Sequence, residues 1–311
     1  MNKILITGGA GNIGGSLASR LVKDPANYIV IVDNLLTGSM AKLPSKNHDN
    51  WRFIKSNVND YNQISAVMLA HHFDYVFHFA AVVGVKRTLE NPLLVLEDLE
   101  GIKNILTLSK NTGVKRVFYS SSSEVYGEPV EIPQYEDTTP LNSRLPYAIV
   151  KNVGEAFFKT YHQEFGLEYN IFRFFNTYGP QQSTDFVISR FLQQALHQDN
   201  ITIYGNGLQT RTFCYIDDNL ETMEKILIGE LHKNSVLNIG SDHEITILDL
   251  AKLIIAETGS KSEIIFLPAL KEGDMTRRKP DISKMKSILQ RDLLSLPEGI
   301  RKTCNESNLL S

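Results

Sequence analysis

Near the middle of the 311-residue chain, two side chains that could act together on a proton stand four residues apart. Tyr147 and Lys151 occupy positions i and i+4 of an expected helix, which places the phenol and the ammonium on one helix face. A free phenol has a pKa of about 10 and is a poor base at neutral pH, but a neighbouring cation favours the phenolate. The pair predicts a general base, and the competing interpretation is an exposed helix pair, because this spacing is common by chance.

A polar cluster at residues 120–127, Ser-Ser-Ser-Ser-Glu-Val-Tyr-Gly, comes after an expected strand over 114–119. Parallel sheets keep their active sites outside the carboxyl ends of their strands, where Ser122 and Glu124 would lie. The bland interpretation of the cluster is a serine-rich turn. The pair of Tyr147 and Lys151 separates the two interpretations and favours an active site.

The elements that must position these groups begin at the first residues. An apolar run, Ile4-Leu5-Ile6, leads into Thr7-Gly8-Gly9-Ala10-Gly11-Asn12-Ile13-Gly14-Gly15. Gly8 and Gly11 would allow a tight turn, and Gly14 would let the next helix pack near the strand. The amide groups at that helix N-terminus would face negative charge. The pattern predicts a pyrophosphate site, although a glycine motif alone would fit an ordinary turn equally well.

The next apolar run, over residues 28–32, ends in Asp33, about 20 residues beyond the glycines. A carboxylate at this place binds the ribose hydroxyls of a dinucleotide, which makes the dinucleotide interpretation of the glycine turn much stronger. It would also repel a 2′-phosphate, and no Lys or Arg occurs over 34–41 to receive one. The cofactor predicted is therefore NAD rather than NADP.

The segment 34–50, which starts at Asn34, is polar and reads as a loop over the nucleotide. A third strand is expected over 52–56, and Asn57 and Val58 come directly after it. The Asn57 amide could meet the adenine at this strand end, and a turn-forming Asn is an equally good interpretation.

A nearly all-apolar run over 73–79 predicts a strand that is covered on both faces. Ala80 and Ala81 come next and are small enough for the backbone to pass beside the cofactor. His78, at the end of the run, is interpreted as a satisfied structural group rather than a catalyst.

Five β–α repeats in this order predict an α/β fold, a doubly wound parallel sheet (the Rossmann fold) with a smaller C-terminal α/β substrate domain. We expect the NAD-binding domain over residues 1–176. Residues 177–311 would form mainly the substrate domain, with crossings of the chain between the two.

The whole-chain composition narrows the partners. The formal charge is −3 with both signs scattered, which gives no basic field for nucleic acid and favours a small-molecule ligand. Two cysteines, and histidines without metal-ligand spacing, predict neither a disulfide framework nor a metal site. Without a signal core or a membrane-length apolar run, the expected compartment is the cytoplasm. Apolar residues over 153–161 suggest a homodimer contact or extra core packing.

At this point the sequence resembles the extended short-chain dehydrogenase/reductase family, in its branch of nucleotide-sugar epimerases, dehydratases and decarboxylases. The resemblance rests on the glycine turn, His78-Phe79-Ala80-Ala81, Ser122-Ser123-Glu124-Val125-Tyr126-Gly127, and Tyr147 with Lys151. The second half adds Arg173-Phe174-Phe175-Asn176-Thr177-Tyr178-Gly179-Pro180, Ile203 to Arg211, and Arg277-Arg278-Lys279-Pro280-Asp281-Ile282.

The resemblance implies a nucleotide-sugar site in the second half. Asn176 would bind the phosphate region, and Arg211 and Arg278 would meet the diphosphate or the sugar. A planar guanidinium suits this work because it binds phosphate or carboxylate with two hydrogen bonds. The alternative interpretation of Arg278 is a solvated charge in a basic run without a binding role. The resemblance to the family favours the binding role.

The family's common first step is oxidation at C4 of the hexose. By resemblance, Tyr147 would take the hydroxyl proton while hydride passes to NAD, Ser122 would bind the same oxygen, and Lys151 would hold the nicotinamide ribose. Glu124 would decide the fate of the 4-keto sugar, because the plain 4-epimerases usually have a small or uncharged residue there.

The resemblance favours a UDP-glucuronate decarboxylase or a UDP-sugar 4-epimerase. The alternatives are a 4,6-dehydratase, in which the Ser123 position often holds an acid, and a 4-dehydrogenase. A different class is a catalytically silent NAD-binding sensor or scaffold, which would have no need of the base.

The predicted site residues fall into three groups. The catalytic residues are Ser122, Glu124, Tyr147 and Lys151. The cofactor-binding residues are Gly8, Gly11, Asn12, Ile13, Gly14, Asp33, Asn34, Asn57, Val58, Ala80, Ala81, Tyr147 and Lys151. The substrate-binding residues are Ser123, Asn176, Arg211 and Arg278.

Overall fold

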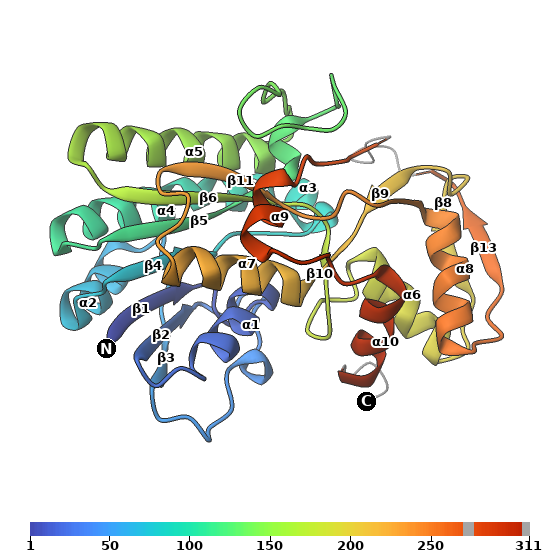
Figure 1. The fold of residues 1–311 in the computed structure, drawn as a ribbon, viewed down its shortest axis with the longest axis horizontal. Coiled ribbons are helices and arrows are strands. Elements are labelled where there is room, and N and C mark those ends of the chain that lie inside the picture. The colour runs from blue at the N-terminus through green and yellow to red at the C-terminus, as the bar shows by residue number, and fades with distance from the viewer. Residues whose placement is uncertain (270–276, 307–311) are drawn as a thin grey trace. The chain divides into compact units, whose positions relative to one another are not determined.

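The computed structural model describes residues 1–269 and 277–306 of the chain (Figure 1). They form two compact units that alternate along the sequence. The first unit consists of Met1–Val125, Ser143–Arg173 and Met223–Leu237, and the second of Tyr126–Asn142, Phe174–Thr222 and the chain from Asn238 onward. Two parts of the expected substrate domain, 270–276 and 307–311, lie outside the described residues.

The first unit is built on a seven-stranded sheet in the order β11-β6-β5-β4-β1-β2-β3. Pairing is parallel from β3 through β2, β1 and β4 to β5. The order reverses between β1 and β4, and ligands of doubly wound sheets bind in the crevice at such a point. The strands are β1 (Asn2–Thr7), β2 (Asn27–Asp33), β3 (Trp51–Lys55), β4 (Tyr75–His78), β5 (Arg116–Ser122), β6 (Glu168–Phe174) and β11 (Ser235–Ile239).

Helices cover both faces of this sheet (Figure 1), which is why its apolar runs are nearly continuous. α2, α4 and α5 pack side by side, and Arg20 of α1 forms a 2.6 Å ion pair with Glu224 of α7. α4 and α5 each begin with a proline and end at a left-handed glycine, Gly113 and Gly166. The helices are α1 (Asn12–Leu21), α2 (Tyr61–His71), α3 (Val85–Glu90), α4 (Pro92–Thr112), α5 (Pro146–Phe165) and α7 (Ile216–Ile228), with short 3-10 turns η1 (Met40–Lys42) and η2 (Ser123–Tyr126).

The second unit combines short strand pairs with helices. β7 (Thr177–Tyr178) pairs in parallel with β10 (Cys214–Tyr215), and β8 (Ile201–Tyr204) with β13 (Ile264–Leu267). β9 (Thr210–Thr212) is antiparallel to β12 (Glu244–Thr246). The helices are α6 (Val187–Leu196), α8 (Ile247–Thr258), α9 (Ser283–Leu289) and α10 (Leu296–Glu306), and α8 packs against both α6 and α10.

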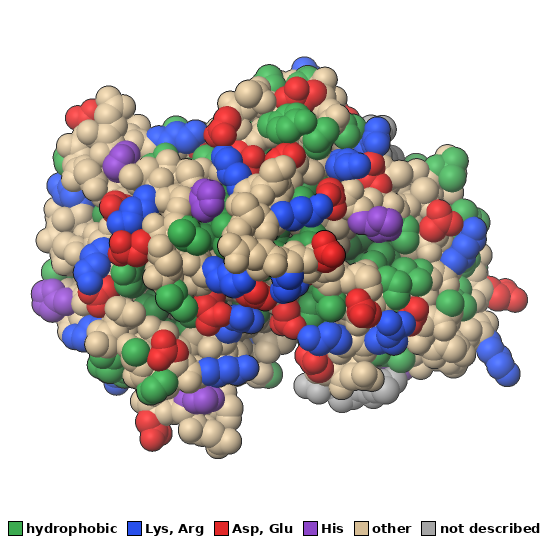
Figure 2. All heavy atoms as spheres, in the orientation of Figure 1, with side chains coloured by type: hydrophobic (Ala, Val, Ile, Leu, Met, Phe, Trp, Pro, Cys, Tyr) green, Lys and Arg blue, Asp and Glu red, His purple; other side chains and the backbone are tan. Residues whose placement is uncertain are grey.

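The predicted fold class, a doubly wound α/β sheet with a smaller α/β region, is confirmed. The expected strand over 114–119 is β5, which begins at Arg116 and continues to Ser122. Ser120, Ser121 and Ser122 of the polar cluster therefore lie at the end of a central strand, and Ser123 begins the 3-10 turn η2. Figure 2 shows charges of both signs interspersed over the face in view. No helix among the described residues is long and apolar enough to cross a membrane.

Candidate active site

The turn after β1 has the tight backbone that a pyrophosphate site requires. Gly8 has φ +67°, and a Cβ there would lie 2.6 Å from the backbone N of Ala80. A Cβ on Gly14 would lie 2.5 Å from the carbonyl oxygen of Gly8, so any side chain would push α1 away from the strand. Both predicted reasons for glycine, the turn and the close helix packing, hold at these positions.

Asp33 ends β2 beside this turn. Its Oδ2 accepts the Ala10 amide at 3.0 Å, its Oδ1 accepts the Leu35 amide at 2.8 Å, and only 8% of the residue is exposed. Lys42 of η1 is half-buried, which lowers its pKa, while the Asp33 charge raises it. Residues 34–41 contain no Lys or Arg, but the next residue, Lys42, is a cation on which the charge of Asp33 acts.

The residues of this region fit a bound dinucleotide. The glycine turn leaves a cradle that a Cβ would fill, and the Oδ1 of Asn12 at the start of α1 is buried without a hydrogen-bond partner among the described residues. A buried polar atom of this kind needs a partner. Asp33 places a carboxylate at the strand end where dinucleotide sites bind ribose hydroxyls. The glycine turn, Asn12 and Asp33 would therefore hold the cofactor.

The remaining predicted cofactor residues lie around the same strand ends. The Oδ1 atoms of Asn34 and Asn57 accept the amides of Leu36 and Asn59 at 2.9 Å and 3.1 Å, which is the turn-forming role. Their contacts to the nucleotide stay predictions. Of the other predicted cofactor-binding residues, Val58 is buried, and Ile13, Ala80 and Ala81 are half-buried.

Removing the charge of Asp33 should weaken the binding of NAD and reduce the preference of the enzyme for NAD over NADP. In Asp33→Asn, loss of hydrogen bonds between a charged group and the ribose should raise the Kd for NADH about 10-fold or more. NADPH should bind better than before, because the 2′-phosphate then meets Lys42 without an opposing carboxylate. Titrations that follow nicotinamide fluorescence measure the Kd for NADH and the Kd for NADPH. Asp24→Asn, at an exposed turn, should change neither, and an unchanged NADH Kd for Asp33→Asn would exclude the ribose contact.

The predicted reacting groups come together at the end of β5. Ser122 is the last residue of the strand, and its Oγ accepts the amide of Glu124 at 3.2 Å. Tyr147 lies in the first turn of α5, where its phenol is hydrogen-bonded by Ser122 and feels the charge of Glu124. A hydroxyl, a phenol and a carboxylate thus share one small region. Ser123, the predicted substrate contact, is buried beside them in η2.

The pKa of the Tyr147 phenol is raised, which corrects the expectation that Lys151 favours its phenolate. Burial is the largest cause, the charges of Glu124 and Asp98 add to it, and only the Ser122 hydrogen bond opposes them. The Lys151 ammonium lies over the ring face, 5.8 Å from its centroid. Loss of solvation therefore outweighs the cation that the sequence placed nearby.

Lys151 is buried, with 3% of its surface exposed. Its ammonium donates to the carbonyl of Ser120 at 2.7 Å. Burial lowers the pKa of Lys151 to about 8, and Asp98 opposes this shift. The ammonium is charged at neutral pH and is held at the end of β5 by the backbone of that strand.

His78 has the structural role that the sequence favoured. It is buried at the end of β4, and its Nδ1 shares a 2.9 Å hydrogen bond with the Thr7 hydroxyl. Burial, with a smaller effect of Lys151, lowers the pKa of His78 to about 3. The ring is therefore neutral and joins β4 to β1.

A buried ion pair that the sequence analysis did not single out anchors α5 to the sheet. Arg173 of β6 donates Nε and Nη2 to the two carboxylate oxygens of Glu155, at 2.9 Å and 2.7 Å. The Ser121 hydroxyl of β5 also donates to Glu155, at 2.6 Å. Glu155 stands four residues after Lys151, one turn along α5, so the network sets the position of this helix against the strand that carries Ser122.

The predicted substrate residues belong to the second unit. Asn176 donates its Nδ2 to the carbonyl of Thr212 at 2.9 Å, and Arg211 of β9 is buried and donates to the Thr210 carbonyl at 2.8 Å. Arg278 is also buried, with 6% exposed. The solvated charge of the basic run is instead Arg277.

The exposed Arg277 forms a bidentate pair with Glu244, at 2.5 Å and 2.7 Å. The bland interpretation of the basic run therefore describes Arg277 and not its neighbour Arg278. The role of Arg278 in substrate binding stays a prediction.

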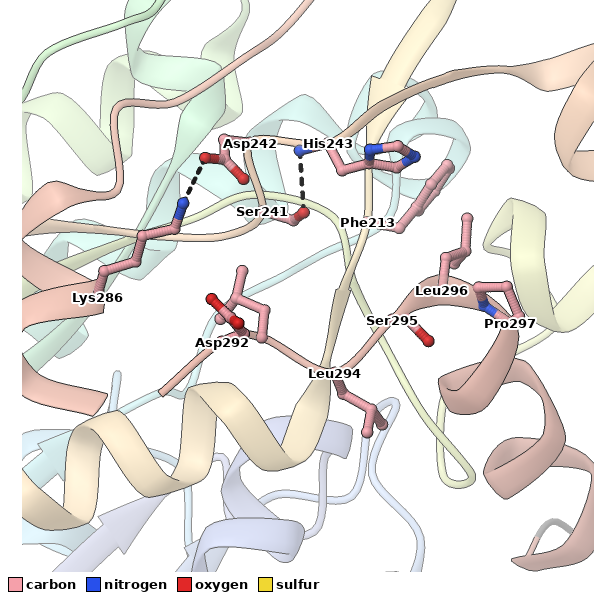
Figure 3. Close-up of a pocket in the computed structure, with 11 residues that line it drawn as sticks. Phe213, Ser241, Asp242, His243, Lys286, Asp292, Leu294, Ser295, Leu296 and Pro297 are labelled. Atoms are coloured by element: carbon pink, nitrogen blue, oxygen red, sulfur yellow. Dashed lines mark hydrogen bonds and ion pairs between the residues drawn. The ribbon is translucent and has the colours of Figure 1, made fainter. Parts of the chain in front are cut away.

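A pocket in the second unit, of about 280 Å³, contains none of the predicted site residues (Figure 3). The Lys286 ammonium pairs with Asp242 at 2.7 Å, and Ser241 Oγ accepts the His243 amide at 3.2 Å. Lys286 and Asp242 thus neutralise each other. The lining residues are Phe213, Ser241, Asp242, His243, Lys286, and residues 292–297. Among the described residues, no group of three His, Cys, Asp or Glu side chains could hold a metal ion.

Comparison with known proteins agrees with this geometry. The model of the NAD dependent epimerase/dehydratase family matches residues 4–240, and the chain belongs to this family. UDP-glucuronic acid decarboxylase 1 of Danio rerio is 34% identical over 97% of this chain and 71% of its own length. UDP-N-acetyl-alpha-D-glucosaminuronate decarboxylase of Bacillus cytotoxicus is 36% identical, over 97% and 96%.

Among solved structures, UDP-glucuronic acid 4-epimerase from Bacillus cereus, in complex with UDP-glucuronic acid and NAD, superposes with a TM-score of 0.88. It is 29% identical, and the match covers 99% of this chain and 100% of that one. The predicted family, the enzyme class and NAD as the cofactor are confirmed. The sensor or scaffold interpretation is set aside.

Proposed function

We propose that this enzyme oxidises C4 of a UDP-hexuronate and then releases the C6 carboxylate as CO₂, the reaction of a UDP-glucuronate decarboxylase. The observation that carries the proposal is Glu124, a carboxylate whose charge acts on the Tyr147 phenol. Oxidation and reduction at C4 need one proton-transfer group, which Tyr147 supplies. A second acid–base group beside it supports chemistry at the adjacent carbon, C5.

Each residue has a defined task in this scheme. Tyr147 takes the C4 hydroxyl proton and later returns it, and Ser122 hydrogen-bonds the same oxygen. NAD, held by the glycine turn, Asn12 and Asp33, would supply the hydride acceptor for C4 and the hydride for the final reduction, and its positive charge would favour the phenolate. The 4-keto hexuronate is a β-keto acid, so the C5–C6 bond breaks with its electron pair moving into the C4–C5 enolate as CO₂ leaves. Glu124, after taking up a proton from water, then delivers that proton to C5.

The two relatives described above support the uronate as substrate, because they are named as decarboxylases of UDP-linked uronic acids. Dehydration is less well supported, since Ser123 offers a neutral hydroxyl where an acid would be needed to expel water. Buried guanidinium groups at Arg211 and Arg278 suit the diphosphate and the carboxylate of such a substrate.

A second candidate is 4-epimerisation of UDP-glucuronate with retention of the carboxylate. The likeness to the Bacillus cereus 4-epimerase over the full length of both chains favours it. The two reactions share the C4 oxidation and the same three residues, Ser122, Tyr147 and Lys151. They differ in whether C5–C6 breaks before the ketone is reduced.

The test is incubation of the NAD-loaded enzyme with UDP-glucuronate, UDP-glucose, UDP-N-acetylglucosamine or GDP-mannose, with products identified by mass. We expect UDP-glucuronate to lose CO₂. An isobaric product would select the 4-epimerase, loss of water a dehydratase, and accumulation of NADH alone a 4-dehydrogenase. If no sugar nucleotide is bound or converted, the proposal fails as a whole.

Glu124→Gln separates the chemistry at C5 from that at C4. Glutamine keeps the shape of the side chain but supplies no proton at C5, so the formation of UDP-pentose should fall about 100-fold or more. Oxidation at C4 should continue, and NADH absorbance should rise after mixing with UDP-glucuronate. Glu128→Gln, an exposed neighbour beyond η2, is the control. Full decarboxylation by Glu124→Gln would show that another group protonates C5.

A further inference from the structure

Asp98 is a buried carboxylate for which the proposed reaction has no task. It lies on α4 with 9% of the residue exposed. Its Oδ2 accepts the amide of Val82 at 2.8 Å, and the side chain of Asn59 gives it another hydrogen bond. A carboxylate is rarely buried unless its charge is compensated, so the source of that compensation indicates what Asp98 does.

Asp98 and Lys151 are held at the carboxyl ends of two paired strands. β4 and β5 are neighbours with parallel register. Asp98 binds the chain just beyond β4, at Val82, and the Lys151 ammonium binds the carbonyl of Ser120 near the end of β5. The helices that carry the two charges, α4 and α5, pack against each other. The anion and the cation therefore reach the same edge of the sheet from adjacent helices.

The surroundings of Lys151 contain few other compensating groups. Its ammonium contacts the Ser120 carbonyl and lies over the rings of Tyr119 and Tyr147, 5.0 Å and 5.8 Å from their centroids. No carboxylate of the described residues forms a direct salt bridge with it. Asp98 is the acidic group whose charge acts on Lys151 and opposes the effect of burial on its pKa.

The charged and titratable groups that face this cluster come from each packed element. From β4, His78 is neutral because burial lowers its pKa to about 3, and from β5, burial raises the pKa of Tyr119 well above its usual value. Glu124 faces Tyr147 from η2. Burial raises the pKa of Asp98 itself, while its hydrogen bonds and the charge of Lys151 lower it. Asp98 is thus the group on α4 that acts on both Lys151 and Tyr147.

We propose that Asp98 is a positioning residue that keeps the Lys151 ammonium charged and thereby sets the pH range in which the site binds NAD and turns over substrate. The turnover part rests on the roles proposed above for Tyr147 and Lys151. A negative charge stabilises the protonated form of each neighbour. Removing it should let Lys151 lose its proton, and Tyr147 become a phenolate, at lower pH.

Asp98→Asn removes the charge and keeps the shape. The amide oxygen can still accept from Val82. The Oδ1 of Asn59 is buried without a hydrogen-bond partner among the described residues. If the Asn59 side-chain amide is flipped, this oxygen can accept a hydrogen bond from the new NH₂ group. A merely structural Asp98 would therefore be replaced without loss. Far-UV circular dichroism and the unfolding midpoint check that the variant is folded.

The first arm measures the Kd for NADH against pH and needs no sugar substrate. In the unaltered enzyme, binding should weaken as Lys151 loses its proton, near the pKa of about 8. In Asp98→Asn this loss should occur about half a pH unit lower or more. Glu100→Gln removes an exposed carboxylate of the same helix, one that pairs with Lys103, and should not move the transition.

The second arm measures kcat against pH on whichever sugar nucleotide is converted. Both limbs of the profile should move to lower pH in Asp98→Asn and stay in place in Glu100→Gln. A profile that is lower but not displaced, with an undisplaced NADH transition, would overturn the proposal. If no sugar nucleotide is converted, the proposed function fails, and the binding arm still decides the role of Asp98.

Discussion

Tyr147→Phe should reduce kcat by about 1,000-fold or more, because it deletes the group that we propose takes the C4 hydroxyl proton. The phenylalanine ring keeps the aromatic face over which the Lys151 ammonium lies. NAD binding should therefore change little. Turnover of UDP-glucuronate and the Kd for NADH are to be measured on the same preparation, so that a loss of turnover cannot be attributed to loss of the cofactor.

Tyr161→Phe is a matched control for this variant. Tyr161 lies on the same helix and also loses a phenol hydroxyl, which shares a 2.8 Å hydrogen bond with Thr107. It is expected to turn over normally. Should Tyr147→Phe retain turnover within about tenfold of the unaltered enzyme, the phenol is not the base, since general acid–base groups contribute about 100-fold or more.

Arg173→Met should destabilise the fold by about 3–5 kcal/mol, because it leaves the Glu155 carboxylate buried without its cation. The side chains of this pair are only 2% and 1% exposed, so water cannot replace the lost hydrogen bonds. The free energy of unfolding, from urea titration of the apoprotein, measures the effect. Replacing both partners, with Glu155→Leu added, should restore much of the loss.

The comparison for Arg173→Met is Arg20→Met, which breaks the ion pair to Glu224 in the same unit. That pair is 30% and 25% exposed, and pairs of this kind contribute about 0–1 kcal/mol. Equal losses in the two variants would mean that the Glu155 network does not act as a buried charge pair.

The part of the fold that could be predicted from sequence depends on local patterns. The glycine turn, the apolar runs of β1 and β2, and the acid at Asp33 are each defined by residues within one β–α–β unit. The Tyr147–Lys151 spacing places both groups on one helix face whatever the rest of the chain does. These parts of the site could be predicted from the sequence for that reason.

The parts that the sequence could not supply depend on burial and on distant segments. Whether Arg277 or Arg278 is the buried guanidinium depends on the position of Glu244, more than 30 residues away in the sequence. The raised pKa of the Tyr147 phenol reflects burial together with Asp98 on a different helix. The return of Met223–Leu237 to the first unit likewise results from packing and not from any motif.

The central claim, that the enzyme oxidises C4 of its substrate, is tested most directly by single-turnover kinetics on UDP-glucuronate carrying deuterium at C4. If the C4–H bond breaks before CO₂ is lost, product should form more slowly from the deuterated than from the ordinary substrate. Product forming at the same rate from both, with no NADH at any time after mixing, would contradict it.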